Sequence, residues 1–133
     1  DAEIAAAPRL PAWDDPGDGT LEERARAYLE SNCAHCHNPQ GRARFSSLYL
    51  EASRPLGIST GICKHPVAAG GGAGEGLFDV VPGHPEQSIL TYRMASTDLA
   101  IRMPEIAKSI VHAEGVKLVQ DWIASLPEQE CVN

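Results

Sequence analysis

Aromatic side chains are scarce in this sequence of 133 residues, which contains only two Trp, three Tyr and two Phe. Its 12 Gly and 10 Pro favour turns over long regular elements. The length suits one domain, but the side chains offer little material for a large core. A large apolar cofactor at the centre would help such a domain to fold.

The chain also lacks an excess of basic charge and a long hydrophobic run. Its 11 Lys and Arg stand against 18 Asp and Glu, which gives a formal net charge of −7. This balance argues against nucleic acid and against an anionic membrane surface as partners. No stretch approaches the roughly 20 apolar residues that cross a bilayer, so we expect no transmembrane segment in this chain.

The first 19 residues lack the basic start and apolar run of a signal peptide. We therefore interpret residues 1–19 as an extended leader or linker and residues 20–133 as the domain.

Three segments of the domain show helical patterns, and none alternates as a strand would. Thr20 and Glu23 form a capping box for a helix over about 21–32. Residues 85–96 predict a short helix with Pro85 near its start, and residues 112–127 predict a helix that Pro127 ends. The long stretch 38–84 is mostly irregular. We therefore predict an all-α, loop-rich fold.

The most reactive side chains gather directly after the first helix, in "CAHCH" at residues 33–37. Two thiols with two residues between them lie on one side of a helical turn and can add to the two vinyl groups of a haem. The next residue, His37, is then placed to bind the iron. Cys33, Cys36 and His37 thus form the attachment motif of a covalent haem c.

Other functions of this motif are a zinc site, a redox dithiol or a chance pattern. A structural zinc site needs four ligands, usually in two pairs, whereas Cys63 and Cys131 are single and far apart. A thioredoxin-like dithiol follows a strand, and here a capped helix precedes the motif. We interpret His35, inside the motif, as a solvent-facing spacer.

The iron needs a sixth ligand, and Met103 is the candidate. Pro104 restricts Met103 to extended conformations, which stiffens the approach of its thioether. Met94 has helical spacing and suits a core position, and Met103 as a core gap filler remains the alternative role. His65 and His84 are reserve ligands. A methionine ligand favours Fe(II), and an iron with two protein ligands suits outer-sphere electron transfer.

The sequence resembles the class I c-type cytochromes, through "YLESNCAHCH", "IRMPEIA" and "GVKLVQDWIASL". A closer similarity, through "GICKHP" and "VPGHPEQSIL", is to monohaem cytochrome domains of bacterial periplasmic proteins and lipoproteins. The resemblance implies crossing N- and C-terminal helices, haem in the core and Met103 as distal ligand. It also implies a proline carbonyl that accepts a hydrogen bond from the proximal imidazole, for which we select Pro55. Residues 57–84 form the expected insertion.

With Cys33 and Cys36 used on haem, Cys63 and Cys131 remain as a pair. Haem attachment of this kind belongs to the periplasm or another oxidising place, so we predict a Cys63–Cys131 disulfide, with two unpaired thiols as the alternative. The predicted location is periplasmic or secreted, with a lipid anchor possible in a longer form.

We therefore expect a single-electron carrier and no enzyme. The expected partner is a redox protein with a basic patch or a fused dehydrogenase-type domain. Arg93 and Arg102 are candidates to pair with haem propionates. A haem enzyme, a sensor of gas or peroxide with a labile sixth ligand, and a haem-free zinc or redox module are the alternative functions.

Overall fold

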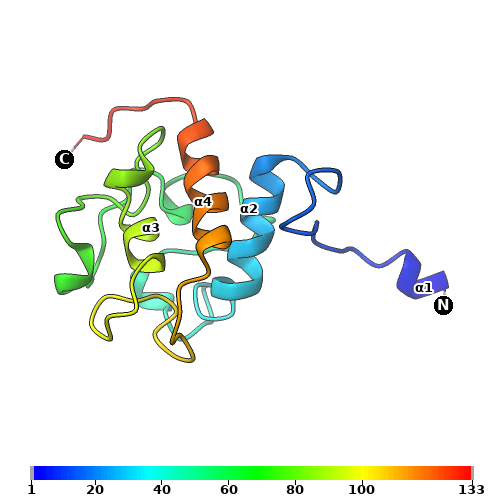
Figure 1. The fold of residues 1–133 in the computed structure, drawn as a ribbon, viewed down its shortest axis with the longest axis horizontal. Helices are drawn as coiled ribbons and strands as arrows, with labels where there is room; N and C mark the ends of the chain where they lie inside the picture. Colours follow the sequence, from blue (N-terminus) through cyan, green and yellow to red (C-terminus); the bar gives the residue numbers. More distant parts are fainter. Residues whose placement is uncertain (1, 133) are drawn as a thin grey trace.

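The structure is a computed structural model that describes residues 2–132, and within this range it contains helices and loops without a strand (Figure 1). The described residues form two isolated β-bridges, one between Ile62 and Val80 and one between Phe78 and Ser88. The α-helices are α1 (Ala2–Ala5), α2 (Leu21–Leu29), α3 (Ile89–Met94) and α4 (Ala113–Ser125). No helix of this range is both long and apolar enough to span a membrane.

Helix α2 begins at the predicted capping box. The Glu23 amide donates to Thr20 Oγ1 at 3.2 Å, and the Thr20 amide donates to the Glu23 carboxylate at 2.8 Å. The helix then widens into the π-type turn η1 (Glu30–Ala34). Here Ser31 and Asn32 donate from their side chains to carbonyls one turn back, at 2.9 and 2.8 Å. The predicted helix thus ends in a turn that leads into the cysteine motif.

Helix α4 is the longest helix, and it packs against α2. Its predicted C-terminal boundary is confirmed, since Leu126 is extended before Pro127. The helices meet in one cluster of buried residues, which includes Ala25, Leu29, Val116, Val119, Trp122 and Ile123. The structure therefore confirms a mostly helical, loop-rich domain in which the N- and C-terminal helices are in contact.

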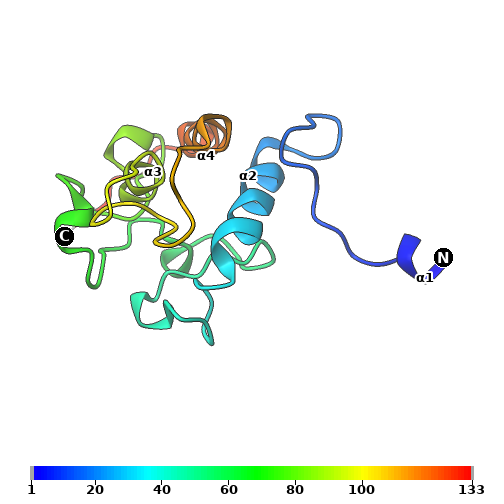
Figure 2. The same cartoon turned by 60° about the horizontal axis from the view of Figure 1, so that its bottom comes forward.

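Glycine lets the two helices come close at one point. A Cβ atom on Gly115 would lie 2.2 Å from the Tyr28 hydroxyl oxygen and 2.6 Å from His112 Nδ1. These two side chains are hydrogen-bonded at 2.9 Å, and the Trp13 ring lies edge-on to both. Trp13 thus attaches part of the predicted leader to the domain. The predicted boundary at residue 19 stays a prediction, and α1 lies apart from the helices in both views (Figures 1 and 2).

The middle of the chain is irregular, as predicted, and short 3-10 turns organise it: η2 (Arg44–Ser46), η3 (Ile58–Thr60) and η4 (Gly70–Ala73). The structure contains the predicted disulfide between Cys63 and Cys131. Beside Cys63, Lys64 and Asp79 form a buried ion pair at 3.0 Å. The helix predicted over 85–96 is shorter than expected. A 3-10 turn, η5 (Pro85–Gln87), and an extended Ser88 precede α3.

Candidate functional site

Backbone hydrogen bonds within the cysteine motif fold it into a tight turn. The amides of His37 and Cys36 both donate to the Cys33 carbonyl, at 2.9 and 3.1 Å. This turn follows α2 and contains both cysteines and His37. Both thiols are free, and both cysteines and His37 are partly buried. The chain turns back sharply at Gly41, where a Cβ atom would lie 2.2 Å from the Cys36 carbonyl oxygen.

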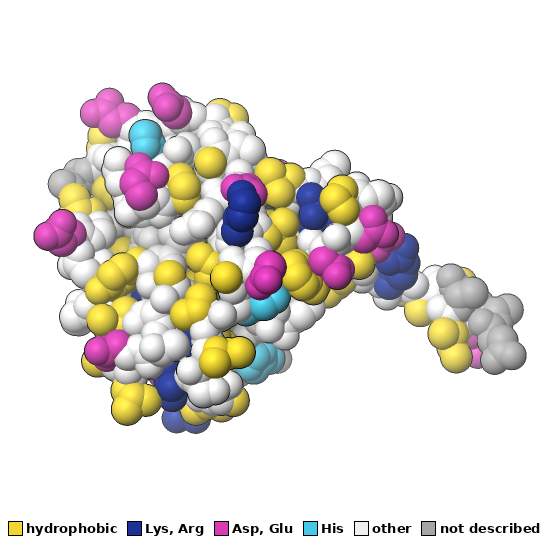
Figure 3. Space-filling view, in the orientation of Figure 1, with side chains coloured by type: hydrophobic (Ala, Val, Ile, Leu, Met, Phe, Trp, Pro, Cys, Tyr) yellow, Lys and Arg dark blue, Asp and Glu magenta, His cyan; other side chains and the backbone are white. Residues whose placement is uncertain are grey.

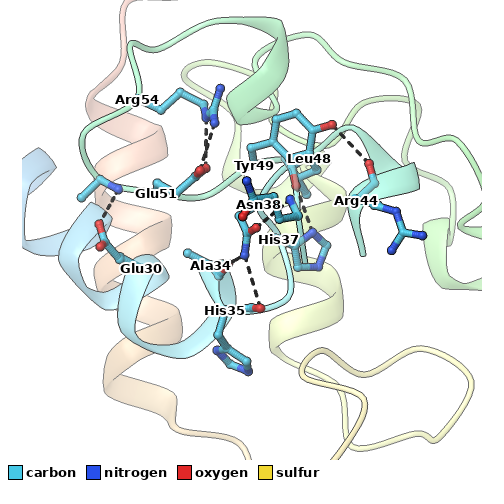
Figure 4. Close-up of polar contacts among 12 residues, drawn as sticks. Glu30, Ala34, His35, His37, Asn38, Arg44, Leu48, Tyr49, Glu51 and Arg54 are labelled. Carbon is cyan, nitrogen blue, oxygen red and sulfur yellow. Dashed lines mark hydrogen bonds and ion pairs between the residues drawn. The ribbon is translucent and has the colours of Figure 1, made fainter. Parts of the chain in front are cut away.

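An extended segment after the motif holds His37 by two hydrogen bonds. His37 Nδ1 lies 3.1 Å from the Leu48 carbonyl (Figure 4). The Leu50 amide donates to the His37 carbonyl at 2.9 Å. The prediction of Pro55 as acceptor is therefore wrong: Leu48 accepts this bond. Pro55 is exposed on the following loop, while residues 48–50 run beside the motif.

The Leu48 bond fixes which imidazole nitrogen carries the proton. A carbonyl oxygen only accepts, so Nδ1 must donate, and Nε2 keeps a free lone pair. Burial lowers the pKa of His37, against smaller opposing effects of the Leu48 bond and the Asp79 charge. His37 is thus a neutral imidazole with Nε2 available to a metal, as in oriented metal-binding histidines generally.

The Cys33 thiol is poorly suited to thiolate chemistry. Burial raises the pKa of Cys33 to about 12, with the neighbouring Cys36 adding to the rise and Lys108 opposing it. Zinc ligands and catalytic dithiols act as thiolates, which an apolar setting disfavours. In residues 2–132, no group of three or more His, Cys, Asp or Glu side chains is arranged to hold a metal ion. The raised pKa of Cys33 argues against the zinc and dithiol alternatives.

Met103 lies on the loop of residues 95–112 that joins α3 to α4, and it is partly buried. Its amide donates to the Arg93 carbonyl at 3.0 Å, which ties the loop to the end of α3. The charge of Glu105 affects the pKa of His37, and that of Lys108 affects the pKa of Cys33, so the loop lies near the motif. Figures 1 and 2 both show this loop beside the chain that follows α2.

The other candidate ligands have partners elsewhere. His35 is exposed, as predicted, and points away from His37 in Figure 4. His65 Nδ1 lies 3.0 Å from the Leu77 carbonyl, and His84 lies between Glu86 and Glu128, at 3.2 and 4.0 Å. Met94 is buried in the core cluster, which confirms its predicted core position.

The two arginines predicted near propionates bind backbone carbonyls of the Met103 loop. Arg93 Nε donates to Ile101 O at 2.8 Å, and Arg102 Nε donates to Glu105 O at 3.0 Å. Arg102 also donates to the Lys108 carbonyl. The structure thus gives both side chains a part in shaping this loop.

Two further features fit a bound group that has both apolar and polar parts. Trp122 Nε1 is the one buried side-chain nitrogen or oxygen in the described residues without a hydrogen-bond partner, which is costly unless a partner is supplied. The loop around Met103 exposes Leu99, Ile106 and Ile110. Figure 3 shows hydrophobic side chains over the lower half of the face on which this loop lies. The donor set of Cys33, Cys36 and His37 therefore fits a covalently attached haem.

Comparison with protein-family models, curated proteins and solved structures finds no match. The functional argument therefore depends on the site. Sequence reasoning missed Leu48 and Lys108. The role of Leu48 belongs to its backbone carbonyl, which leaves no side-chain signature, and Lys108 acts through contacts that only the folded loop creates.

Proposed function

We propose that this chain is a monohaem c-type cytochrome domain of the class I fold that carries single electrons. The observation that carries the proposal is the motif turn, in which two free cysteines are followed directly by a neutral imidazole with an oriented Nδ1–H. The contact of α2 with α4 and the position of the Met103 loop near the motif support the same fold.

In this proposal each residue has a distinct task. Cys33 and Cys36 would hold the haem through two thioether bonds to its vinyl groups. His37 binds the iron through Nε2, while Leu48 O holds the Nδ1 proton and orients the ring. Met103 would supply the second protein ligand of the iron, and its sulfur would favour the reduced state. The haem supplies one-electron exchange between its ferric and ferrous states.

The Met103 loop favours an electron carrier over an enzyme or gas sensor. Several hydrogen bonds tie this loop to itself and to the end of α3, among them those from the Met103 amide, from Arg93 Nε, from Arg102 Nε, and from Lys108 Nζ to Met94 O and Met103 O. A ligand on a loop fixed in this way leaves no open position for substrate. Electrons then pass through the haem edge to a protein partner in a small, short-lived interface.

The proposed location is the periplasm or the outside of the cell. The disulfide between Cys63 and Cys131 fits such an oxidising compartment. The net charge of −7 supports a redox partner with a basic docking patch, or a fused dehydrogenase-type domain.

Spectroscopy of the matured protein tests the ligand set. We expect the ferric protein to show the near-infrared charge-transfer band of iron bound to methionine sulfur. The variant M103A should lose this band, bind CO rapidly when reduced and show a lower reduction potential, because the soft sulfur is gone.

The matched control is M94L, at the only other methionine of the sequence. It conserves the volume of a buried core residue and should keep the band. A high-spin ferric spectrum and fast CO binding in the unaltered protein would instead support the enzyme or sensor.

A further inference from the structure

Lys108 makes an unusual set of contacts for a lysine five residues after Met103. Its Nζ donates to Met103 O at 3.0 Å and to Met94 O, and lies 3.5 Å from Arg93 O. Arg93 and Met94 are the last two residues of α3. One ammonium group therefore joins the carboxyl end of a helix to the residue proposed as distal ligand.

These acceptors explain why a lysine suits this position. The last carbonyls of a helix have no partner within the helix, and cationic side chains satisfy them. An ammonium has three N–H donors, which matches the three carbonyls around it. Hydrogen bonds from a charged donor are stronger than those between neutral groups.

The backbone of Lys108 is held as well. Arg102 donates to the Lys108 carbonyl, and the Met103 amide donates to Arg93 O at 3.0 Å. The chain from 102 to 108 is therefore a closed loop with Met103 near its start and Lys108 at its end. Without the Lys108 side chain, the link between the Met103 carbonyl and α3 is lost, while the Met103 amide bond remains.

We propose that Lys108 is a positioning residue that clamps the Met103 loop to α3 and so keeps the distal sulfur in place on the iron. This inference rests on the proposed function. Lys108 does not touch the iron in this role. Lys108 acts through the Met103 carbonyl. Removing the Lys108 side chain should therefore weaken the bond between the Met103 sulfur and the iron without abolishing it.

The test is displacement of the distal ligand by imidazole in the matured ferric protein. The variant K108M keeps an unbranched side chain but removes all three donors. We expect K108M to bind imidazole about tenfold to a hundredfold more tightly, the range for lost hydrogen bonds to a charged group, and also faster. K108R keeps the charge and the donors and should restore most of the difference.

K117M is the matched control. It removes the same unit charge from an exposed lysine of α4 that pairs with Asp121 at 2.7 Å. K117M should bind imidazole as the unaltered protein does. Urea titrations with two probes separate loosening of the loop from unfolding of the whole domain. In K108M, the urea midpoint measured by far-UV circular dichroism should shift far less than the midpoint measured by loss of the charge-transfer band. If K108M is unstable, K108Q keeps donors at a shorter reach and should give an intermediate affinity.

Two results would overturn the inference, and they differ in what else they affect. If the unaltered protein shows the iron–methionine band and K108M binds imidazole as K117M does, the clamp is wrong and the proposed ligand set stands. If the unaltered protein lacks the band and M103A changes nothing, the ligand assignment fails, and the clamp fails with it.

Discussion

The chain contains two pairs of cysteines, of which one pair is free and the other forms a disulfide. Cys33 and Cys36 lie in one turn, remain free and adjoin an oriented imidazole. Cys63 and Cys131 are 68 residues apart and form a disulfide that ties the irregular middle of the chain to its end. One pair is placed by local helical geometry, whereas the other is brought together by the whole fold. Spacing therefore distinguishes the pair proposed to anchor a cofactor from the pair that forms a structural crosslink.

The largest expected effect comes from removing the local pair. The double variant C33S/C36S should lose all covalent haem, because no thiol remains for the vinyl groups. Acid–acetone extraction followed by absorption of the protein fraction measures this directly. The variant C63S/C131S should keep its haem through the same extraction. Loss of covalent haem from both double variants would contradict the assignment of different roles to the two cysteine pairs.

Removing the distant pair should cost stability and leave the spectrum unchanged. Closing a loop of 68 residues removes chain entropy worth about 4 kcal/mol in the unfolded state. We therefore expect C63S/C131S to lose up to about this amount in the free energy of urea unfolding. A changed charge-transfer band in this variant would show that the crosslink also shapes the site.

A smaller effect should follow from crowding the crossing of α2 and α4. G115A places a methyl group where Tyr28 and His112 already lie, within 2.6 Å of both, so these side chains must move. Overpacking of this kind costs typically 1–3 kcal/mol, which urea unfolding of the matured protein can measure. G71A is the matched control, since its Cβ atom would meet nothing within 4 Å. Equal losses in the two variants would contradict the close contact.

The smallest effect belongs to the start of α2. T20A removes one half of the capping box and should cost about 1 kcal/mol in unfolding free energy. The haem spectrum should stay the same, because the motif lies at the other end of the helix. A spectral change in T20A would show that the start of α2 also affects the position of the motif.

Features that depend on residues close together in the sequence agree best with their predictions. The capping box and α4 depend on residues within a turn or two of each other, and the structure confirms their predicted positions. The α-helical part of the predicted helix ends at Leu29, and the chain continues to Ala34 as the π-type turn η1. Leu48 was missed because backbone carbonyls are alike in every residue, so only the folded chain selects one.

Long-range contacts were harder to foresee. The disulfide was predicted by pairing the cysteines that remained, without any geometry. The Lys108 contacts and the buried pair of Lys64 with Asp79 arise from loops whose paths no local pattern specifies. Glycine and proline in these loops permit many conformations, and tertiary packing selects among them.

The most direct test of the account is the intact mass of the matured chain, together with its pyridine haemochrome spectrum. The account predicts one haem per chain, retained under denaturing conditions, with the spectrum of a haem that has two thioether bonds. A colourless protein whose mass equals that of the polypeptide alone, after expression with a haem-maturation system, would contradict it.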